Sequence, residues 1–283
     1  GRRRGLVRMT AAEVATPAGA RGLGAGVTRG IRAWGPPTLL LVGLLAVWEI
    51  AVRSLGIKQF ILPRPLAIAE AWVTYLPELY AAARYTFLEI LAGLVIGATA
   101  GIVIGIVTAR YRFMQDSLMP FAVAASSIPI LAFAPIFNNW FGLDQQLSKA
   151  MVAAVLCFFP VMINTVRGLT NVDARALELL RSYAASETAV FRKLRVPNSL
   201  PYVFTALRLA VTLATIGAVV GEYFAAPRSS LGQYIATYSA FLNFERSWAA
   251  IVFACIIGIG LYLIVAIAER VVMPWYDRQA EWR

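Results

Sequence analysis

The sequence predicts an all-α polytopic membrane protein with about six transmembrane helices and a long, charged helical loop between spans four and five. Three observations predict this. The chain of 283 residues is 59% hydrophobic and only 14% charged, whereas soluble domains are about 45–50% apolar and about 25% charged. Its apolar residues fall in long segments, and its basic residues gather between alternate segments. A water-facing globule and a disordered chain are both excluded by this composition.

Six apolar segments approach the length of about 20 residues that a helix needs to cross a bilayer. The first is short, and the third is interrupted by Pro129 and Pro135. Together they define a predicted membrane domain at residues 38–274. The six segments are Thr38–Val52, Phe87–Ala109, Leu118–Phe137, Leu147–Val166, Val203–Phe224 and Trp248–Ala268.

The two ends of the chain are predicted to lie outside the bilayer. Residues 1–37 combine seven arginines with glycine and alanine, which is typical of a flexible basic tail, with an arm for anionic lipid headgroups as the alternative. Residues 275–283 form a second short tail. Basic residues follow the second, fourth and sixth segments more densely than the others, although the first outer loop also has some. The positive-inside rule therefore predicts that both termini are cytoplasmic.

Composition excludes several kinds of chemistry. The chain has no histidine, so histidine-dependent catalytic, metal and proton-relay sites are excluded. Cys157 and Cys255 lie in apolar runs, where cysteine acts as a small hydrophobe. None of Lys58, Lys149 and Lys193 belongs to a phosphate-binding loop. We therefore expect no catalytic residue, no metal site and no cofactor in this chain, and a net charge of +11 that sets membrane orientation and does not bind nucleic acid.

Small residues recur at helical spacing in two of the segments. In the second segment they predict one helix face that a neighbouring helix can approach closely, with a direct role toward a solute as the alternative. The fifth segment repeats the pattern with alanines. Either face is also a candidate for contact with a second copy of the chain. The residues are Gly93, Gly97, Gly101 and Gly105 in the second segment, and Ala206, Ala210, Ala214 and Ala218, with Gly217 and Gly221, in the fifth.

Candidates for a translocation pathway lie mainly in the third segment. Proline interrupts a helix, and irregular backbone at membrane depth is tolerated only where protein or a water-filled cavity covers it. A kink that serves packing alone is an equally good interpretation. The fifth segment adds an acid, Glu222, and Tyr223. The candidates are Ser126, Ser127, Pro129, Asn138, Asn139, Tyr223 and Glu222.

Other ionisable residues also fall within or beside the segments. They are Glu49, Glu89 and Arg208, and such groups usually face a cavity or a partner. Arg208 is close enough to its segment's cytoplasmic end to extend to that surface, and Glu222 to the outer one.

The loop at about residues 171–200 is amphipathic and too long for a simple turn. Asp173 is placed to cap a helix from Ala174 to Tyr183, which Leu177 and Leu180 make apolar on one face. A second short helix is expected from 187 to 195, ending at Val196–Pro197. A helical pair of this kind is typical of a docking element for a soluble partner, with an internal lid as the alternative.

This loop resembles the cytoplasmic signature of permease subunits of bacterial ABC importers: Glu-Ala-Ala, three residues, Gly, nine residues, Ile, one residue, Leu-Pro. Glu178 matches the acid and Pro197 the proline, while Ala184 stands in place of the glycine. The other matched positions are Leu179, Leu180, Leu194 and Val196. Since glycine tolerates a left-handed backbone angle that alanine adopts only with strain, Ala184 puts the sharpness of this turn in question.

Further segments resemble the sulfonate, taurine and nitrate branch of that family, and the resemblance covers about residues 37–274. They are Arg181–Ser182, Ala185–Ser186, Pro201, Leu207–Ala210, Leu62–Pro65, Ser127–Pro135 and Trp140–Gly142.

The resemblance implies a permease subunit, not an enzyme, in the bacterial inner membrane. It implies a second permease copy, most simply an identical one, two cytoplasmic ATPase subunits that bind ATP and Mg²⁺, and an external solute-binding protein. Glu178, Leu179, Leu180, Arg181, Ser182, Ala184 and Pro197 would then form coupling helices against the ATPase. The solute would be a sulfonate, taurine, nitrate, bicarbonate or a pyrimidine-like vitamin precursor. A secondary transporter or channel without an ATPase is the alternative, and a membrane-embedded enzyme is disfavoured by the few acids within the spans.

Overall fold

A computed structural model describes residues 23–143, 145–224 and 229–275, with side chains described from Gly35 onward. Over these ranges every regular element is a helix. Five of the helices are long and apolar enough to cross a membrane, and a bent pair raises the number to six. The predicted all-α polytopic fold is therefore confirmed. Contacts divide the chain into residues 1–51 and residues 52–283.

The first unit consists, in its described part, of most of helix α1, Leu23–Ser54. Its membrane-spanning portion is Gly35–Ser54, and its apolar side chains from Leu39 to Ile50 are almost all exposed. The helix includes residues 23–37, which the sequence pattern assigned to the basic tail. Pro36–Pro37 favoured a boundary there, but the helix continues through both prolines. Residues 1–22 lie outside the described part of the chain.

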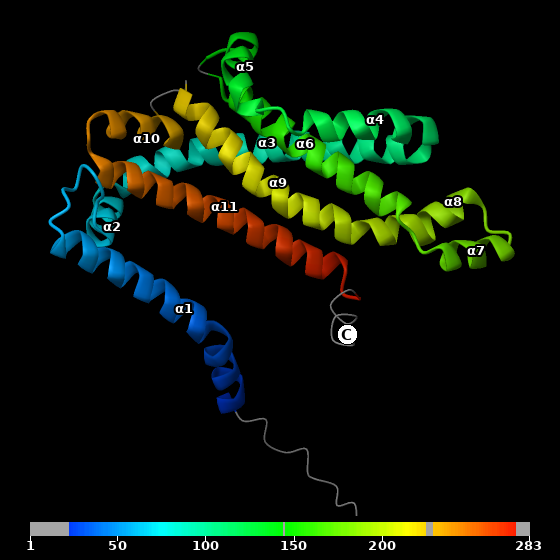
Figure 1. Cartoon of the computed structure of the whole chain (residues 1–283), viewed down its shortest axis with the longest axis horizontal. Helices are drawn as coiled ribbons and strands as arrows, with labels where there is room; N and C mark the ends of the chain where they lie inside the picture. The colour runs from blue at the N-terminus through cyan, green and yellow to red at the C-terminus, as the bar shows by residue number, and fades with distance from the viewer. Residues whose placement is uncertain (1–22, 144, 225–228, 276–283) are drawn as a thin grey trace, which may run out of the picture. The chain divides into compact units, whose positions relative to one another are not determined.

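The long helices of the second unit are α3, α6, α9 and α11, and its short helices include α2 and α10 (Figure 1). The short helices α2 and α10, which hydropathy did not predict, lie near the same end of this unit (Figure 1), because α2 contacts α11 and α10 contacts α9 and α11. Each long helix extends beyond its predicted apolar segment, because the more polar residues that flank the segment are helical as well. The bounds are α2 Pro65–Thr74, α3 Leu76–Arg110, α6 Gln146–Thr170, α9 Val196–Phe224, α10 Leu231–Ala240 and α11 Phe244–Val272.

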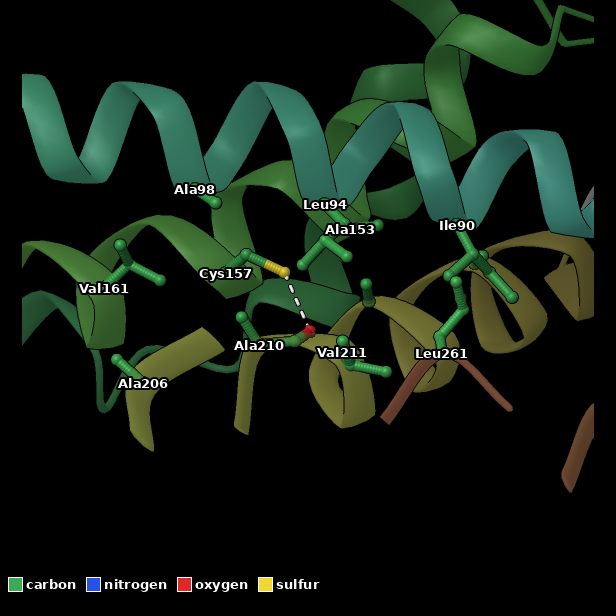
Figure 2. Close-up of a cluster of buried hydrophobic side chains, with 12 residues drawn as sticks. Ile90, Leu94, Ala98, Ala153, Cys157, Val161, Ala206, Ala210, Val211 and Leu261 are labelled. Carbon is green, nitrogen blue, oxygen red and sulfur yellow. Dashed lines mark hydrogen bonds between the residues drawn. The ribbon is translucent and has the colours of Figure 1, made fainter. Parts of the chain in front are cut away.

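Small residues allow α3, α6 and α9 to pack closely. A Cβ atom added at Gly97 would lie 2.3 Å from the carbonyl oxygen of Ala154, so the α3 and α6 backbones are in contact. On α9, Ala210, Ala214 and Ala218 are fully buried, and the Cys157 thiol of α6 donates to the Ala210 carbonyl at 3.1 Å (Figure 2). Both small-residue faces therefore pack within the chain and are not free to contact a second copy.

The third predicted span is broken. Helix α4, Arg112–Ala125, is followed by the 3₁₀ turn η1, Ile130–Phe133, and by α5, Ala134–Phe141, and the two halves are bent by 79°. Pro129 lies in the break, as predicted, but Pro135 lies in the first turn of α5, where its missing N–H is not needed. Gly142 ends α5 with a φ of 98°, an angle that favours glycine.

The chain from the loop into the fifth span is one continuous helical segment, 187–224. It begins as α8, Glu187–Val190, widens into a π-helical turn, η2, Phe191–Arg195, and continues as α9. The predicted end at Val196–Pro197 is therefore wrong. The wide turn just before Pro197 removes the usual close contact between a proline ring and the carbonyl of the preceding turn, so the helix passes through the proline.

Candidate functional site

The loop between α6 and α9 begins with a capped helix, α7, Ala174–Ser182. The Asp173 side chain accepts a hydrogen bond from the backbone N–H of Arg175 at 2.9 Å, which confirms the predicted N-cap. The helix ends one residue earlier than expected, with Tyr183 as its C-cap. Asp173 thereby fixes the start of the segment that carries Glu178.

Ala184 forms the turn after α7. Its φ is 51°, in the left-handed region. The N–H of Ala184 donates to the Arg181 carbonyl at 2.9 Å, and the N–H of Ala185 donates to the Leu180 carbonyl at 3.1 Å. These two bonds form a Schellman motif, which normally has glycine at this position. The turn of the resembled signature is therefore present, with alanine adopting the backbone angle of glycine.

Helix α7 presents an uncovered surface. It has no buried residue, and Leu179 and Tyr183 are 57% and 78% exposed. Glu178, Arg181 and Ser182 are exposed as well, whereas Leu177 and Leu180 are half-buried. An apolar and charged helix face that the described residues leave open is suited to a protein partner.

The base of the loop is held by an amide that the sequence analysis missed. The Asn198 side chain, one residue after Pro197, donates to the carbonyl oxygens of Gly168 at 2.8 Å and Asn171 at 2.9 Å. Asn171 in turn donates to the Tyr202 hydroxyl at 3.0 Å. The end of α6 and the start of α9 are thus joined beneath the loop. An asparagine beside the signature proline was the only available sequence signal.

The structure separates the predicted pathway residues into two sets. Glu222 is fully buried and Asn138 is 6% exposed, so both face the interior of the chain, and Glu222 does not extend to the outer surface as expected. The remaining candidates are exposed. They are Ser126, Ser127 and Pro129 in the break of the third span, Asn139 on α5 and Tyr223 at the end of α9.

Glu222 belongs to a buried polar cluster that joins α3, α9 and α10. One carboxylate oxygen accepts from the Thr86 hydroxyl at 2.7 Å, and the other accepts from the Gly232 N–H at 2.7 Å. Glu89 of α3 and Lys149 of α6, both buried, interact electrostatically with Glu222. The Lys149 ammonium also donates to the Leu143 carbonyl. Of this cluster, only Glu89 and Glu222 were singled out from sequence.

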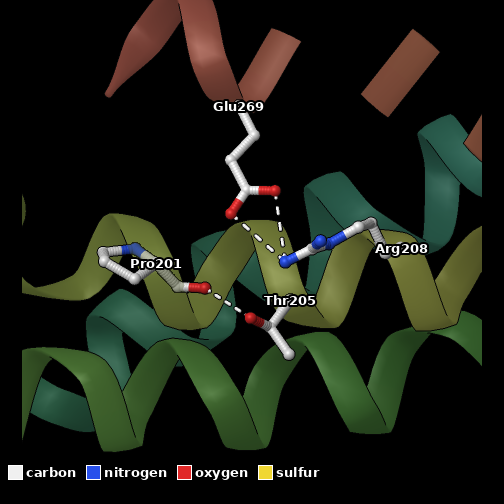
Figure 3. Close-up of polar contacts among 4 residues, drawn as sticks. All are labelled: Pro201, Thr205, Arg208 and Glu269. Atoms are coloured by element: carbon white, nitrogen blue, oxygen red, sulfur yellow. Dashed lines mark hydrogen bonds and ion pairs between the residues drawn. The ribbon is translucent and has the colours of Figure 1, made fainter. Parts of the chain in front are cut away.

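Arg208 pairs across the bundle. Its guanidinium lies 3.2 Å from a carboxylate oxygen of Glu269 on α11 (Figure 3). The charge of Arg208 is thus paired within the protein, whereas the sequence suggested that the side chain extends to the membrane surface. One turn earlier, the Thr205 hydroxyl donates to the Pro201 carbonyl at 2.8 Å (Figure 3).

A second cluster surrounds Arg246 near the start of α11. Its guanidinium carbon lies 3.3 Å from the ring centre of Tyr75 and 4.7 Å from that of Tyr238, and one N–H donates to the Tyr238 hydroxyl at 2.7 Å. Tyr234 donates to Glu78 at 3.3 Å. Burial, with Tyr238 and Glu78 nearby, raises the pKa of the Tyr234 hydroxyl, so it remains a donor. The cluster joins α3, α10 and α11.

These features define a class. The chain is a multi-span helical membrane protein with an exposed helical loop whose base is held by hydrogen bonds, and the described residues contain no cluster suited to a metal ion. The sequence profile of the binding-protein-dependent transport system inner membrane component matches residues 101–278. The chain therefore belongs to this family of ABC importer permeases, as its loop predicted.

Individual relatives agree with this assignment. A formylaminopyrimidine transport permease from Halalkalibacterium halodurans is 33% identical, with 86% of this chain and 96% of the relative covered. A riboflavin transport system permease from Chloroflexus aurantiacus is 31% identical, covering 85% and 89%. A putative aliphatic sulfonates transport permease from Bacillus subtilis is 28% identical, covering 86% and 88%.

A solved structure, the crystal structure of an amino acid ABC transporter with histidines, has the same fold. Its TM-score is 0.57 at 15% identity, with 70% of this chain and 95% of that chain covered. The solved structure shows the fold alone; because the chain belongs to the family of ABC importer permeases, it is a transport subunit and not an enzyme, and ATP hydrolysis belongs to a separate subunit. Membership of the family implies both an ATPase and a solute-binding protein as partners.

Proposed function

We propose that two identical copies of this chain form the translocation pathway of an importer, with a cytoplasmic ATPase on each coupling loop and an external binding protein on the opposite face. The ATPases bind ATP and Mg²⁺, and this chain binds neither. The single observation that carries the ATPase assignment is the loop: α7 is capped, is followed by a sharp turn and has no buried residue. Glu178 and its neighbours are the contact residues.

The charge distribution supports a cytoplasmic position for this loop, and the arginines within residues 1–37 and 270–283 support the same position for both termini. Basic residues are concentrated at the end of the second unit where α3 and α6 end and α7 lies (Figure 1), and positive loops remain inside. They are Arg110, Arg112, Arg167, Arg175, Arg181, Arg192, Lys193, Arg195 and Arg270.

The broken span supports a pathway between two copies. Residues 126–129 lie outside a helix and are exposed, and such backbone is not stable against lipid tails. Large apolar side chains flank it, with Phe121 67% and Trp140 69% exposed. A second copy would cover the apolar part of this face and would leave a water-filled passage at Ser126, Ser127 and Pro129, with Asn139 and Tyr223 as further candidates.

A small heterocyclic organic solute fits this face better than a permanent anion. From Phe113 to Leu143 the sequence contains no arginine or lysine, although cationic groups are the usual partners of sulfonate or nitrate. The relatives named for formylaminopyrimidine and riboflavin transport are 33% and 31% identical to the chain, and the one named for sulfonates is 28% identical. Preferential uptake of sulfonate or nitrate in competition assays would contradict this assignment.

The decisive experiment compares two charge reversals in the chain expressed with the ATPase encoded beside it. Glu178→Lys should abolish ATPase association, measured by native mass spectrometry, and ATP-dependent uptake. Glu70→Lys changes an exposed acid on α2 and should affect neither. A Glu178→Lys complex with two ATPases and normal uptake would overturn the proposal, and uptake by the chain alone, driven by an ion gradient, would establish a secondary transporter instead.

A further inference from the structure

The buried cluster around Glu222 lies at the end of α9 that is opposite the coupling loop (Figure 1). We propose that Glu222, Thr86 and Gly232 are positioning residues that make α10 move with α9, so that a displacement of the coupling loop reaches the opposite membrane face. The inference rests on the proposed function of the loop, since it requires an ATPase that moves α7.

The first argument is continuity. Residues 187–224 form one uninterrupted helical segment, which begins inside the loop at Glu187 and reaches Glu222 in its last turn. Asn198 joins the base of this segment to α6, and the alanines of α9 are buried against the core. Closely packed helices of this kind move as rigid bodies and do not bend continuously.

The second argument is the direct contact of α10 with α9. A Cβ atom added at Gly232 would lie 2.3 Å from the Val219 carbonyl oxygen and 2.5 Å from the Cβ of Glu222. Only glycine allows this approach, since real Cβ atoms do not come so close to a neighbouring backbone. The first turn of α10 therefore lies directly on the last turns of α9.

The third argument is a hydrogen-bond network with no exposed member. Thr86 donates to Glu222 at 2.7 Å and accepts from the Leu231 N–H at 3.0 Å, while Glu222 accepts from the Gly232 N–H. Two of the N–H groups that begin α10 are thus satisfied by side chains of α3 and α9, and a carboxylate is favourable at a helix N-terminus. Breaking such a bond leaves a buried group unpaired, which opposes separation of the helices.

Burial also excludes a direct contact between the residues of this cluster and the solute. Thr86, Glu222 and Leu231 each have 0% exposure, so none of them contacts a solute in this conformation. The charged groups nearest to Glu222, Glu89 on α3 and Lys149 on α6, are buried as well. The cluster is therefore enclosed by α3, α6, α9 and α10, and its effect on transport must pass through the position of α10.

The test uses the complex with its ATPase and two matched pairs of variants. Thr86→Val keeps the shape of the side chain and removes the hydroxyl, while Thr86→Ser keeps the hydroxyl. Gly232→Ala forces α10 away from α9, while Gly260→Ala adds a Cβ on α11 where no atom lies within 4 Å. Hydrogen exchange at α7 and α10 is measured with and without ATP, Mg²⁺ and vanadate.

In the unchanged protein we expect the nucleotide to change exchange rates in both α7 and α10, by about fivefold or more, the lower end of typical coupling between sites. Thr86→Val and Gly232→Ala should keep the response of α7 and lose that of α10. Thr86→Ser and Gly260→Ala should keep both responses. If a variant of one pair fails to insert into the membrane, the other pair alone still tests whether α10 moves with α9.

Two results would overturn the inference. One is an unchanged response of α10 in Thr86→Val and Gly232→Ala, and the other is loss of ATPase association in these variants, which indicates a structural role alone. If α7 does not respond to nucleotide even in the unchanged protein, the coupling function of the loop is contradicted, and the two failures are thereby distinguished.

Discussion

Ala184 is the residue at which backbone strain and the coupling loop coincide. A left-handed φ, here 51°, brings an alanine Cβ too close to the following carbonyl oxygen, which costs about 1–2 kcal/mol. Ala184→Gly should therefore stabilise the folded end of α7 by about 1 kcal/mol, measured as the free energy of local opening by hydrogen exchange. Equal effects of Ala184→Gly and of Ala185→Gly, whose φ is negative, would show that strain is not the cause.

The loop and the buried cluster differ in how far single residues could be predicted. The Asp173 cap and the turn at Ala184 depend on neighbours within a few positions. The sequence pattern located the cap, and the resemblance to the family signature indicated the position of the turn, although alanine left its sharpness in question. The bond between Thr86 and Glu222 joins residues 136 positions apart. No local pattern encodes such a partner, so Thr86, Lys149 and Gly232 were missed, and Glu222 was predicted to reach the surface.

At the scale of elements, the α3–α6 contact depends on its glycines. A Cβ at Gly97 would meet the carbonyl oxygen, carbonyl carbon and Cα of Ala154 within 2.9 Å, and backbone cannot move aside as a flexible side chain can. Gly97→Ala should destabilise the protein by about 1–3 kcal/mol, measured by unfolding in mixed detergent micelles. Gly260→Ala should change stability little, and a similar loss in both variants would contradict the close approach.

Hydropathy predicted the spans because their apolar residues are contiguous. It missed α2 and α10, which are each 10 residues long and therefore shorter than a span. The expected end of the second loop helix at Val196–Pro197 was based on the proline and not on hydropathy. Proline is compatible with a continuous helix here because of the π-helical turn before it. No residue pattern in the loop indicates such a backbone adjustment. Elements defined by tertiary contacts were thus the ones that sequence could not locate.

At the scale of the whole molecule, the packing of the glycine and alanine faces inside the chain changes which surface is free for a second copy. Both faces contact α6, so the dimer contact proposed for them is not available. The exposed α4–η1–α5 face, with its interrupted backbone, is the better candidate. Sequence predicted interruptions at Pro129 and Pro135, of which only Pro129 lies in the break, and only the fold shows that Ser127 is exposed.

The accessibility of position 127 therefore distinguishes a water-filled pathway from a lipid-facing surface. In a Cys255→Ser background, Ser127→Cys should react with a charged, membrane-impermeant thiol reagent, because the proposed passage between two copies contains water. Val95→Cys is the matched control, since Val95 lies on α3 within a membrane span and is 55% exposed, yet thiolate formation and charged reagents are both disfavoured in lipid. The native Cys157 is fully buried and should remain unlabelled. Labelling is measured by mass spectrometry in proteoliposomes and again in detergent, where the cysteines introduced at positions 127 and 95 both become accessible. Equal protection of the two positions in proteoliposomes would place the broken span against lipid or packed protein and remove it from the pathway.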